Sequence, residues 1–333
     1  MTRKFVLVTG GAGFIGSNIV AALCEQDRYE VAVCDRLRGA ELGKWRNLAK
    51  HPIADFMAPE QMFVWLDGHA GQVEAVIHMG AVSSTTEPDA DKIVQSNFVL
   101  SRDLWTWCGR NGARLIYASS AATYGDGEAG FADDNDPQAL AGLRPMNAYG
   151  WSKWLFDIFA TRERSRGLGP SQTAGLKFFN VYGPNEGHKE GMKSVVAQIW
   201  PQAGKGEAVR LFKSHREGYA DGGQLRDFVY VRDAAQVALW LLDSPQINGV
   251  FNLGSGQARS FADLAGETFR AAGHEPRIEY VDMPVILREK YQYFTQADLT
   301  RLRAAGYTAP MTSLEEGVGD YVRRYLSQPD PYR

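Results

Sequence analysis

The chain lacks several features that would assign it to a particular class of protein. Its net charge of −3 gives no general attraction for nucleic acid or an anionic membrane. It has no apolar run near the roughly twenty residues that cross a bilayer. A strand pattern begins within the first five residues, which leaves no room for a signal peptide. We therefore expect neither a membrane nor a nucleic-acid partner.

Cysteine is also scarce. Cys24, Cys34 and Cys108 are an odd number, sit in apolar patterns and lack the spacing of metal ligands. We expect buried, reduced thiols, no metal site and a cytoplasmic location. The remaining composition is that of an ordinary globular protein, with 333 residues, 44% hydrophobic and 23% charged. This length suits one large domain or two smaller ones.

The most specific pattern is a glycine-rich turn near the N-terminus. An apolar run over residues 5–9 leads into it, and apolar residues at helical spacing follow. Gly10 allows the tight turn, Gly13 lets the backbone approach a pyrophosphate, and Gly16 lets the helix pack on its strand. Asp35 closes the next strand, where an acid would meet an adenosine ribose. We expect the turn to bind a dinucleotide through Gly10, Gly13, Phe14, Ile15 and Gly16; the alternative is a glycine-rich turn in another α/β protein.

Strand and helix patterns alternate over residues 1–180, as in a parallel sheet. Strands are predicted at 31–34, 73–78, 114–119 and 176–179, and helices at 100–108 and 149–162. Further along, short strands are predicted at 209–212, 227–231 and 249–253, and helices at 193–204, 232–243 and 260–272. We predict an α/β fold with a Rossmann-type doubly wound parallel sheet over 1–180. A smaller, partly interleaved α/β substrate lobe follows over 181–330, with 227–253 as a candidate to return to the first domain. The polar stretch 214–225 is predicted to be a mobile loop over a site.

Tyr149 and Lys153 are four residues apart in a predicted helix, so the phenol and the ammonium share a face. A free tyrosine has a pKa near 10, and a neighbouring ammonium favours the phenolate. The spacing alone is common and usually coincidental. Here it follows a dinucleotide pattern and a serine-rich segment, 118–125, at the C-terminal end of a strand. Reacting groups gather at that edge of an open α/β sheet.

These motifs together carry a family resemblance. The glycine turn, Ser120, Tyr149 and Lys153 resemble the extended short-chain dehydrogenase/reductase superfamily, in which nucleotide-sugar epimerases are prominent. Further segments resemble, more narrowly, the family of ADP-L-glycero-D-manno-heptose 6-epimerases; they lie at 78–86, 118–125, 179–184, 186–189, 294–300 and 302–307. The resemblance runs from about Phe5 to about Tyr321.

The resemblance implies epimerisation at carbon 6 of the heptose in an ADP-heptose, through a transient ketone and with no net redox change. Such a reaction needs two acid/base groups, which match Tyr149 and Lys189. Ser120 matches a residue that polarises the ketone, and Lys153 one that binds the nicotinamide ribose and lowers the pKa of Tyr149. Without the resemblance, Lys189 would be interpreted as a solvated loop lysine. His188 is expected either to position the loop or to contact the substrate and not to be catalytic, and His78 is expected to be a packed, hydrogen-bonded residue.

For the cofactor the resemblance implies tightly bound NADP, with NAD as the alternative. Asp35 favours NAD because a carboxylate repels a ribose 2′-phosphate, whereas Arg36 and Arg38 favour NADP. Lys44 matches a basic family position, although the segment 36–44 is longer than the family pattern. The other residues expected along the cofactor are Gly80, Ala81, Ser83, Asn97 and Val181.

The expected substrate contacts are Ser120, Asn180, Lys189, Gly191, Phe212, Arg226 and Tyr291. Arg226 is the candidate for the ADP diphosphate, where bidentate geometry suits arginine; the alternative is a surface ion pair with Asp227 or Asp233. The loop at 213–225 is longer than in the family. The resemblance further implies a homo-oligomer, with a pentamer as the first candidate, and a part in lipopolysaccharide core biosynthesis.

The motifs also bear on rival functions. A sugar-nucleotide dehydratase needs carboxylates directly after Ser120, where this chain has Ala121 and Ala122. Another nucleotide-sugar epimerase or a reductase of the same superfamily stays open, and a reductase would stop once its bound cofactor was spent. A catalytically silent binding module is disfavoured because Tyr149 and Lys189 are both present.

Overall fold

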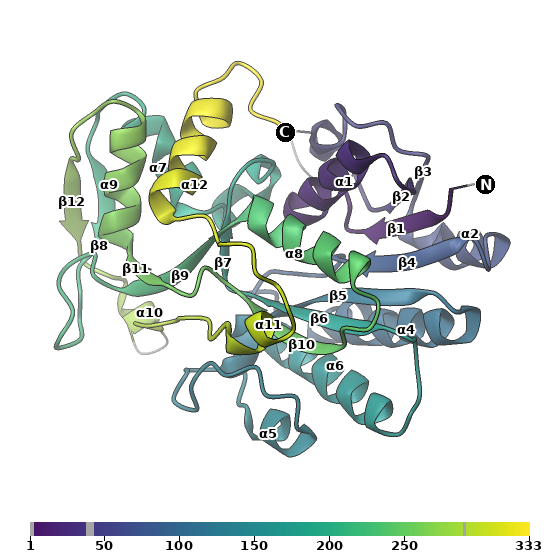
Figure 1. Ribbon diagram of the computed structural model, residues 1–333. Helices are drawn as coiled ribbons and strands as arrows, with labels where there is room; N and C mark the ends of the chain where they lie inside the picture. Colours follow the sequence, from purple (N-terminus) through teal and green to yellow (C-terminus); the bar gives the residue numbers. More distant parts are fainter. Residues whose placement is uncertain (1–2, 38–42, 289–290) are drawn as a thin grey trace.

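The predicted parallel sheet is present in the computed structural model, which describes residues 3–37, 43–288 and 291–333 (Figure 1). Among these residues the sheet has seven strands in the order β10-β6-β5-β4-β1-β2-β3, all parallel. The strands are β1 (Phe5–Thr9), β2 (Glu30–Cys34), β3 (Asp55–Met57), β4 (Val73–His78), β5 (Arg114–Ser120), β6 (Thr173–Phe178) and β10 (Gly249–Leu253). The sequence did not predict β3. The order confirms the doubly wound Rossmann-type fold.

Helices cover both faces of this sheet, so its strands are buried on both sides. Helices α1 (Phe14–Gln26) and α8 (Val231–Asp243) pack against each other on one face, and α4 (Leu100–Asn111) and α6 (Ala148–Ser165) lie on the other (Figure 1). The alternation within β1 matches this arrangement. Val6 and Val8 join the core with α1 and α8, while Leu7 joins the core with α4 and α6. The long apolar strand patterns therefore reflect burial on two faces.

The second lobe holds two smaller sheets. One has the order β11-β9-β7, from Ala258–Ser260, Leu225–Tyr230 and Asn180–Tyr182, and the other pairs β8 (Val209–Phe212) with β12 (Ile278–Val281). Helices α7 (Val195–Ala203), α9 (Phe261–Ala271) and α12 (Leu314–Tyr321) pack with them (Figure 1). The strand predicted at 227–231 is β9, and it joins the second lobe, whereas α8 and β10 return to the main sheet. The domain boundary at residue 180 stays a prediction.

Short helical segments connect these elements. They are α2 (Met62–Gly68), α3 (Ala90–Ile93), α5 (Pro137–Gly142), α10 (Val285–Arg288), α11 (Thr300–Ala304), η1 (Lys44–Asn47), η2 (Pro59–Gln61), η3 (Val94–Val99), η4 (Ala121–Tyr124), η5 (Gly187–Met192) and η6 (Val322–Leu326). Within the described ranges, no helix is both long and apolar enough to cross a membrane. Cys34 and Cys108 are buried free thiols as expected, whereas Cys24 is partly exposed.

The polar loop at 213–225 is held by its own hydrogen bonds. Ser214 N donates to Asp221 Oδ1 at 2.8 Å, and Gly222 N donates to Phe212 O at 3.0 Å. The ring of Tyr219 packs on Tyr293, with centroids 5.0 Å apart. That the loop is mobile stays a prediction.

Candidate active site

The glycine turn has the close contacts that its sequence predicted. Gly10 has a φ of +65°, and a Cβ on it would lie 2.6 Å from Gly80 N. A Cβ on Gly16 would lie only 2.1 Å from Gly10 O. Gly16 therefore lets α1 begin directly against the turn, with the N-terminus of the helix at Phe14. The amides of Gly10, Ala12 and Gly13 are bonded within the protein, so the N–H groups of the first turn of α1 are those that fit a pyrophosphate.

A cleft of about 620 Å³ opens above this turn, at the C-terminal edge of the main sheet, and Phe228, Phe261 and Leu264 of the second lobe close it. Predicted site residues from distant parts of the chain line it together. They are Gly10, Gly13, Phe14, Ile15, Gly16, Asp35, Lys44, Gly80, Ala81, Ser83, Ser120, Tyr149, Lys153, Asn180, Val181 and Lys189. The volume suits a ligand of nucleotide size.

Six predicted residues do not line this cleft: Arg36, Asn97, Gly191, Phe212, Arg226 and Tyr291. Arg36 instead pairs with Glu60 at 2.6 Å on the surface. Asn97 is buried and acts behind the wall, because its side chain hydrogen-bonds both Val82 N and Val82 O, at 2.8 and 2.9 Å. It thereby fixes the loop that carries Gly80 and Ser83. Arg38 lies outside the described residues.

Arg226 lies behind the second-lobe wall. Its guanidinium stacks over the rings of Phe261 and Tyr291, at 5.6 and 5.2 Å, and Phe261 itself lines the cleft. The alternative ion pairs are not formed, because Asp227 accepts hydrogen bonds from Ser255 N and other backbone amides, and Asp233 accepts from Thr312. Phe212 lies at the end of β8, and Gly191 lies in η5 beside open space.

Tyr149 and Ser120 meet because α6 begins close to the end of β5. Asn147 caps the helix by accepting from Gly150 N at 2.8 Å, and a Cβ on Gly150 would lie 2.6 Å from Ala122 O. Burial raises the pKa of Tyr149, and a hydrogen bond with Ser120 acts in the opposite direction. The pKa of Tyr149 is therefore raised, whereas we expected the neighbouring Lys153 to lower it. Burial of the phenol is the larger effect.

Lys153 is buried one turn further along α6. Burial lowers its pKa to about 8, and the Asp157 carboxylate opposes this shift. An ammonium with so low a pKa lies near its titration point at neutral pH, which is typical of residues in reactive sites. Its expected role on a cofactor ribose stays a prediction.

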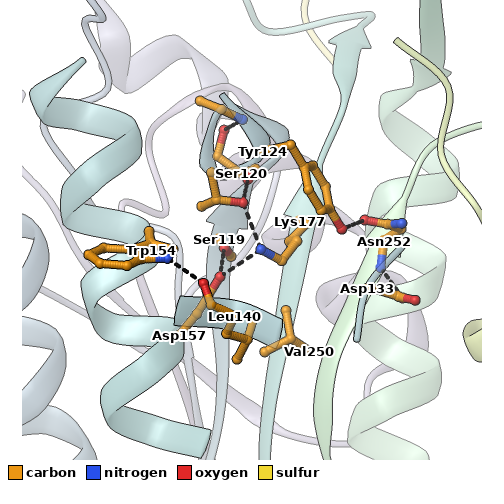
Figure 2. Close-up of polar contacts among 12 residues, drawn as sticks. Ser119, Ser120, Tyr124, Asp133, Leu140, Trp154, Asp157, Lys177, Val250 and Asn252 are labelled. Atoms are coloured by element: carbon orange, nitrogen blue, oxygen red, sulfur yellow. Dashed lines mark hydrogen bonds and ion pairs between the residues drawn. The ribbon is translucent and has the colours of Figure 1, made fainter. Parts of the chain in front are cut away.

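A buried ion pair adjoins the Ser120 end of β5 (Figure 2). Lys177 Nζ of β6 lies 3.1 Å from Asp157 Oδ2 of α6, and both side chains have no exposed surface. Lys177 Nζ also donates to Thr123 Oγ1 at 2.6 Å, and Thr123 Oγ1 donates to Ser120 O at 2.8 Å. The face of the Tyr124 ring lies 4.7 Å from the same ammonium. The pair therefore supports the turn that holds Ser120.

The same carboxylate also ties β5 to α6. Tyr117 OH donates to Asp157 Oδ1 at 3.0 Å, and Ser119 Oγ donates to Asp157 Oδ2 at 2.7 Å. Asp157 is one turn beyond Lys153 on α6. One side chain thus links the strand and the helix that carry the predicted reactive groups. Sequence reasoning missed Asp157 and Lys177, although Asp157 continues the four-residue spacing of Tyr149 and Lys153.

Lys189 reaches the cleft from η5. Its Nζ lies 5.0 Å from the centre of the Phe14 ring, at the start of α1. Burial lowers the pKa of Lys189, and the Glu186 carboxylate opposes the shift. Glu186 is itself buried and accepts from Ser194 N and Ser194 Oγ, both at 2.5 Å. The side chain of Lys189 is therefore partly buried in the cleft, and Lys189 is not the solvated loop lysine of the alternative interpretation.

Asp35 is engaged at the rim of the cleft. It accepts from Ala12 N at 2.9 Å and from Lys44 Nζ at 2.6 Å.

The two histidines differ in their surroundings. His78 is buried between Thr9 Oγ1 and Ser101 Oγ, at 2.6 and 3.0 Å, which confirms a packed residue.

His188 lines the cleft, and burial lowers its pKa to about 4. It is neutral at pH 7 and can accept a hydrogen bond. Several other lining residues were not predicted: Met79, Thr85, Ala118, Ser119, Phe178, Phe179, Tyr182, Met192, Lys193, Ser194, Val195, Phe228, Phe261 and Leu264. The last two come from α9, and no local pattern points to them.

Comparison with known proteins identifies the family. The model of the NAD dependent epimerase/dehydratase family matches residues 6–254. An ADP-L-glycero-D-manno-heptose-6-epimerase of Nitratidesulfovibrio vulgaris is 50% identical over 329 residues, which cover 98% of this chain and 99% of the relative. The crystal structure of the Helicobacter pylori ADP-L-glycero-D-manno-heptose-6-epimerase matches with a TM-score of 0.79 at 30% identity, over 97% of this chain and 96% of that chain.

A Thermus thermophilus UDP-glucose 4-epimerase, solved in complex with NAD, matches with a TM-score of 0.74 at 28% identity, over 95% of this chain and 96% of that chain. The family match spans well over half of the sequence, and it begins in β1 and ends just beyond β10. It therefore includes the glycine turn, Ser120, Tyr149 and Lys189. The chain belongs to the NAD dependent epimerase/dehydratase family.

Proposed function

We propose that the chain is an isomerase that converts ADP-D-glycero-D-manno-heptose into ADP-L-glycero-D-manno-heptose by inverting carbon 6. One observation carries the proposal. Tyr149 and Lys189, from α6 and η5, line a single cleft with Ser120. The 50% identity over nearly the full length with an ADP-heptose epimerase supports the choice of sugar.

The residues around the glycine turn fit a nicotinamide dinucleotide, because Gly10 and Gly16 leave a cradle that a Cβ would fill. When bound, this cofactor supplies a reversible hydride acceptor. The protein must then manage the proton on the carbon-6 oxygen twice, once on each face of the sugar carbon. Tyr149 holds or releases that proton on one face, and Lys189 does so on the other. Ser120 donates a hydrogen bond to the oxygen and stabilises its developing charge.

The lowered pKa of Lys189 suits this role. An amine acts as a base only when it is neutral, and its ordinary pKa near 10.4 would keep it protonated at pH 7. Burial shifts the protonation equilibrium of Lys189 towards the neutral amine, and the Glu186 carboxylate favours the charged ammonium. Lys189 can therefore both take and return a proton. Lys153 supplies a positive charge beside the phenol of Tyr149 whenever it is protonated.

We infer NADP as the cofactor. Lys44 lies 2.6 Å from Asp35, and both side chains are largely buried, so the ammonium offsets the carboxylate that would repel a 2′-phosphate. Mass spectrometry of the small molecules released on denaturation tests this inference. We expect NADP, and NAD alone would overturn it.

The remaining expectations belong to the same proposal. Asn180, which lines the cleft, is proposed to contact the ADP-heptose. Arg226, Tyr291 and Phe212 do not line the cleft, so substrate contacts by these residues, and a role for Arg226 on the diphosphate, stay predictions. A homo-oligomer, first a pentamer, is expected in solution and is tested by light scattering. A cytoplasmic location and a part in lipopolysaccharide core biosynthesis stay predictions.

Turnover of ADP-D-glycero-D-manno-heptose by the purified protein tests the function. We expect many turnovers without added cofactor, because each cycle restores the cofactor to its starting state. A reductase would stop after one bound equivalent. Turnover of UDP-glucose but not of the ADP-heptose would assign another sugar, and no activity on either would favour a binding protein.

A further inference from the structure

Asn47 joins the glycine turn to the segment that carries Lys189. It is the last residue of η1, and only 1% of its surface is exposed. Its Nδ2 donates to Ala12 O at 2.9 Å and to Asn185 O at 3.2 Å, and it lies 3.2 Å from His188 Nδ1. Ala12 belongs to the glycine turn, and Asn185 and His188 directly precede Lys189. A single buried amide thus connects the two segments.

The backbone on both sides of Lys189 has an uncommon conformation. Asn185, before it, has a φ of +74° and Glu190, after it, a φ of +50°, in the left-handed region that Asn enters more readily than Glu. Asn185 is held there by its own side chain, whose Nδ2 donates to Ser17 Oγ at 3.0 Å. Arg333 N donates to its Oδ1 at 3.0 Å. These contacts anchor the segment to α1 and to the C-terminal residue, and Asn47 adds an anchor on the turn itself.

A second anchor, at Glu186, ties the segment to the second lobe. Glu186 accepts from Ser194 N and Oγ at the start of α7, which belongs to the second lobe. Lys189 therefore lies between an anchor on the second lobe and one on the dinucleotide turn. Both ends of the short helix η1 make contacts near the turn. Lys44 at its start bonds Asp35, and Asn47 at its end bonds Ala12 O. Asn47 ties the segment of Lys189 to that turn directly, beside the bond of Asn185 to Ser17 of α1.

We propose that Asn47 is a positioning residue that fixes Lys189 relative to the bound dinucleotide. The inference rests on the proposed role of Lys189 as the second acid/base group. His188 Nδ1 lies 3.2 Å from the side-chain amide nitrogen of Asn47, and the His188 ring also hydrogen-bonds the Asn185 backbone, so the imidazole packs against this junction. Misplacing a reacting group by about 1 Å can cost on the order of 10²-fold in rate. Loss of the Asn47 amide should therefore affect one proton transfer and spare the other.

The experiment measures the single-turnover appearance of reduced nicotinamide with each heptose epimer separately. Tyr149 and Lys189 serve opposite faces, so Lys189→Met should slow oxidation of one epimer more than that of the other. Asn47→Ala, and the isosteric Asn47→Asp, which cannot donate to Ala12 O, should slow the same epimer by about tenfold or more relative to the other. His188→Ala removes only the third contact and should give a smaller change in the same direction.

Asn252→Ala is the matched control. Asn252 is fully buried and hydrogen-bonded to Tyr124 OH, Phe131 O and Asp298 O, away from the Lys189 segment, so both epimers should respond alike. Equal effects of the Asn47 variants on both epimers, with Lys189→Met still selective, would overturn the inference and leave the proposed function standing. If the Asn47 variants do not fold, an unselective His188→Ala overturns it. A Lys189→Met enzyme without selectivity would overturn the proposed function itself, and this inference with it.

Discussion

Removing the Lys177 amine should destabilise the fold strongly. Lys177 and Asp157 have no exposed surface and lie 3.1 Å apart (Figure 2). In Lys177→Met the Asp157 carboxylate loses its ion-pair partner and keeps the hydrogen bonds from Tyr117 OH and Ser119 Oγ, with the charge of Lys153 one turn away on α6. Breaking a buried ion pair from one side costs about 3–5 kcal/mol, because it leaves a charge in the interior without its partner. We expect the free energy of unfolding of Lys177→Met to fall by about this amount.

Urea unfolding followed by tryptophan fluorescence measures this loss. The double variant Lys177→Met/Asp157→Asn leaves no unpaired charge, so its loss should be smaller than the sum of the two single losses, by about 0.5–3 kcal/mol. Lys92→Met is the control, since its ammonium pairs with Glu87 on the surface, and we expect no measurable change. A Lys177→Met loss below about 1 kcal/mol, or strict additivity in the double variant, would refute the reasoning.

Three further predictions follow from single contacts. Gly16→Ala places a Cβ 2.1 Å from Gly10 O, so the purified variant should contain no bound dinucleotide; a fully loaded variant, measured by absorbance, would contradict this. Lys44→Met uncovers the Asp35 carboxylate and should lower the ratio of NADP to NAD released on denaturation, and an unchanged ratio would contradict it. Burial lowers the pKa of His78 to about 3, so the folded state keeps it neutral, and the stability that it contributes is complete above pH 6.5 and lost as the pH falls towards 3. Between pH 7 and about pH 4.5, His78→Gln should therefore lose about 2–3 kcal/mol less than the parent in urea titrations, and parallel losses would argue against this cause.

The sequence predicts best what lies within one turn or one helix. The glycine turn and the Tyr149–Lys153 pair are local patterns with fixed geometry, and the cleft contains all of their members. Strand positions in the main sheet followed from apolar runs. Lys189 was different, because only the family resemblance distinguished it from a solvated loop lysine.

Contacts between distant segments could not be predicted in this way. Asn47 hydrogen-bonds residues 35 and 138 positions away in the chain, and Lys177 of β6 pairs with Asp157 of α6. Nothing in the local sequence distinguishes these side chains from ordinary polar residues. Nothing in the sequence indicated that Arg226 stacks on Phe261, because that contact depends on how α9 packs, and its predicted contact with the substrate stays a prediction.

The initial rate of Lys189→Met on ADP-D-glycero-D-manno-heptose, measured with its cofactor bound, tests the central claim most directly. A second acid/base group contributes about 10²–10⁴-fold, so we predict a loss of this size, matched by Tyr149→Phe and with the dinucleotide content unchanged. A Lys189→Met rate close to that of the parent would show that this amine takes no part in proton transfer, and the account would be wrong.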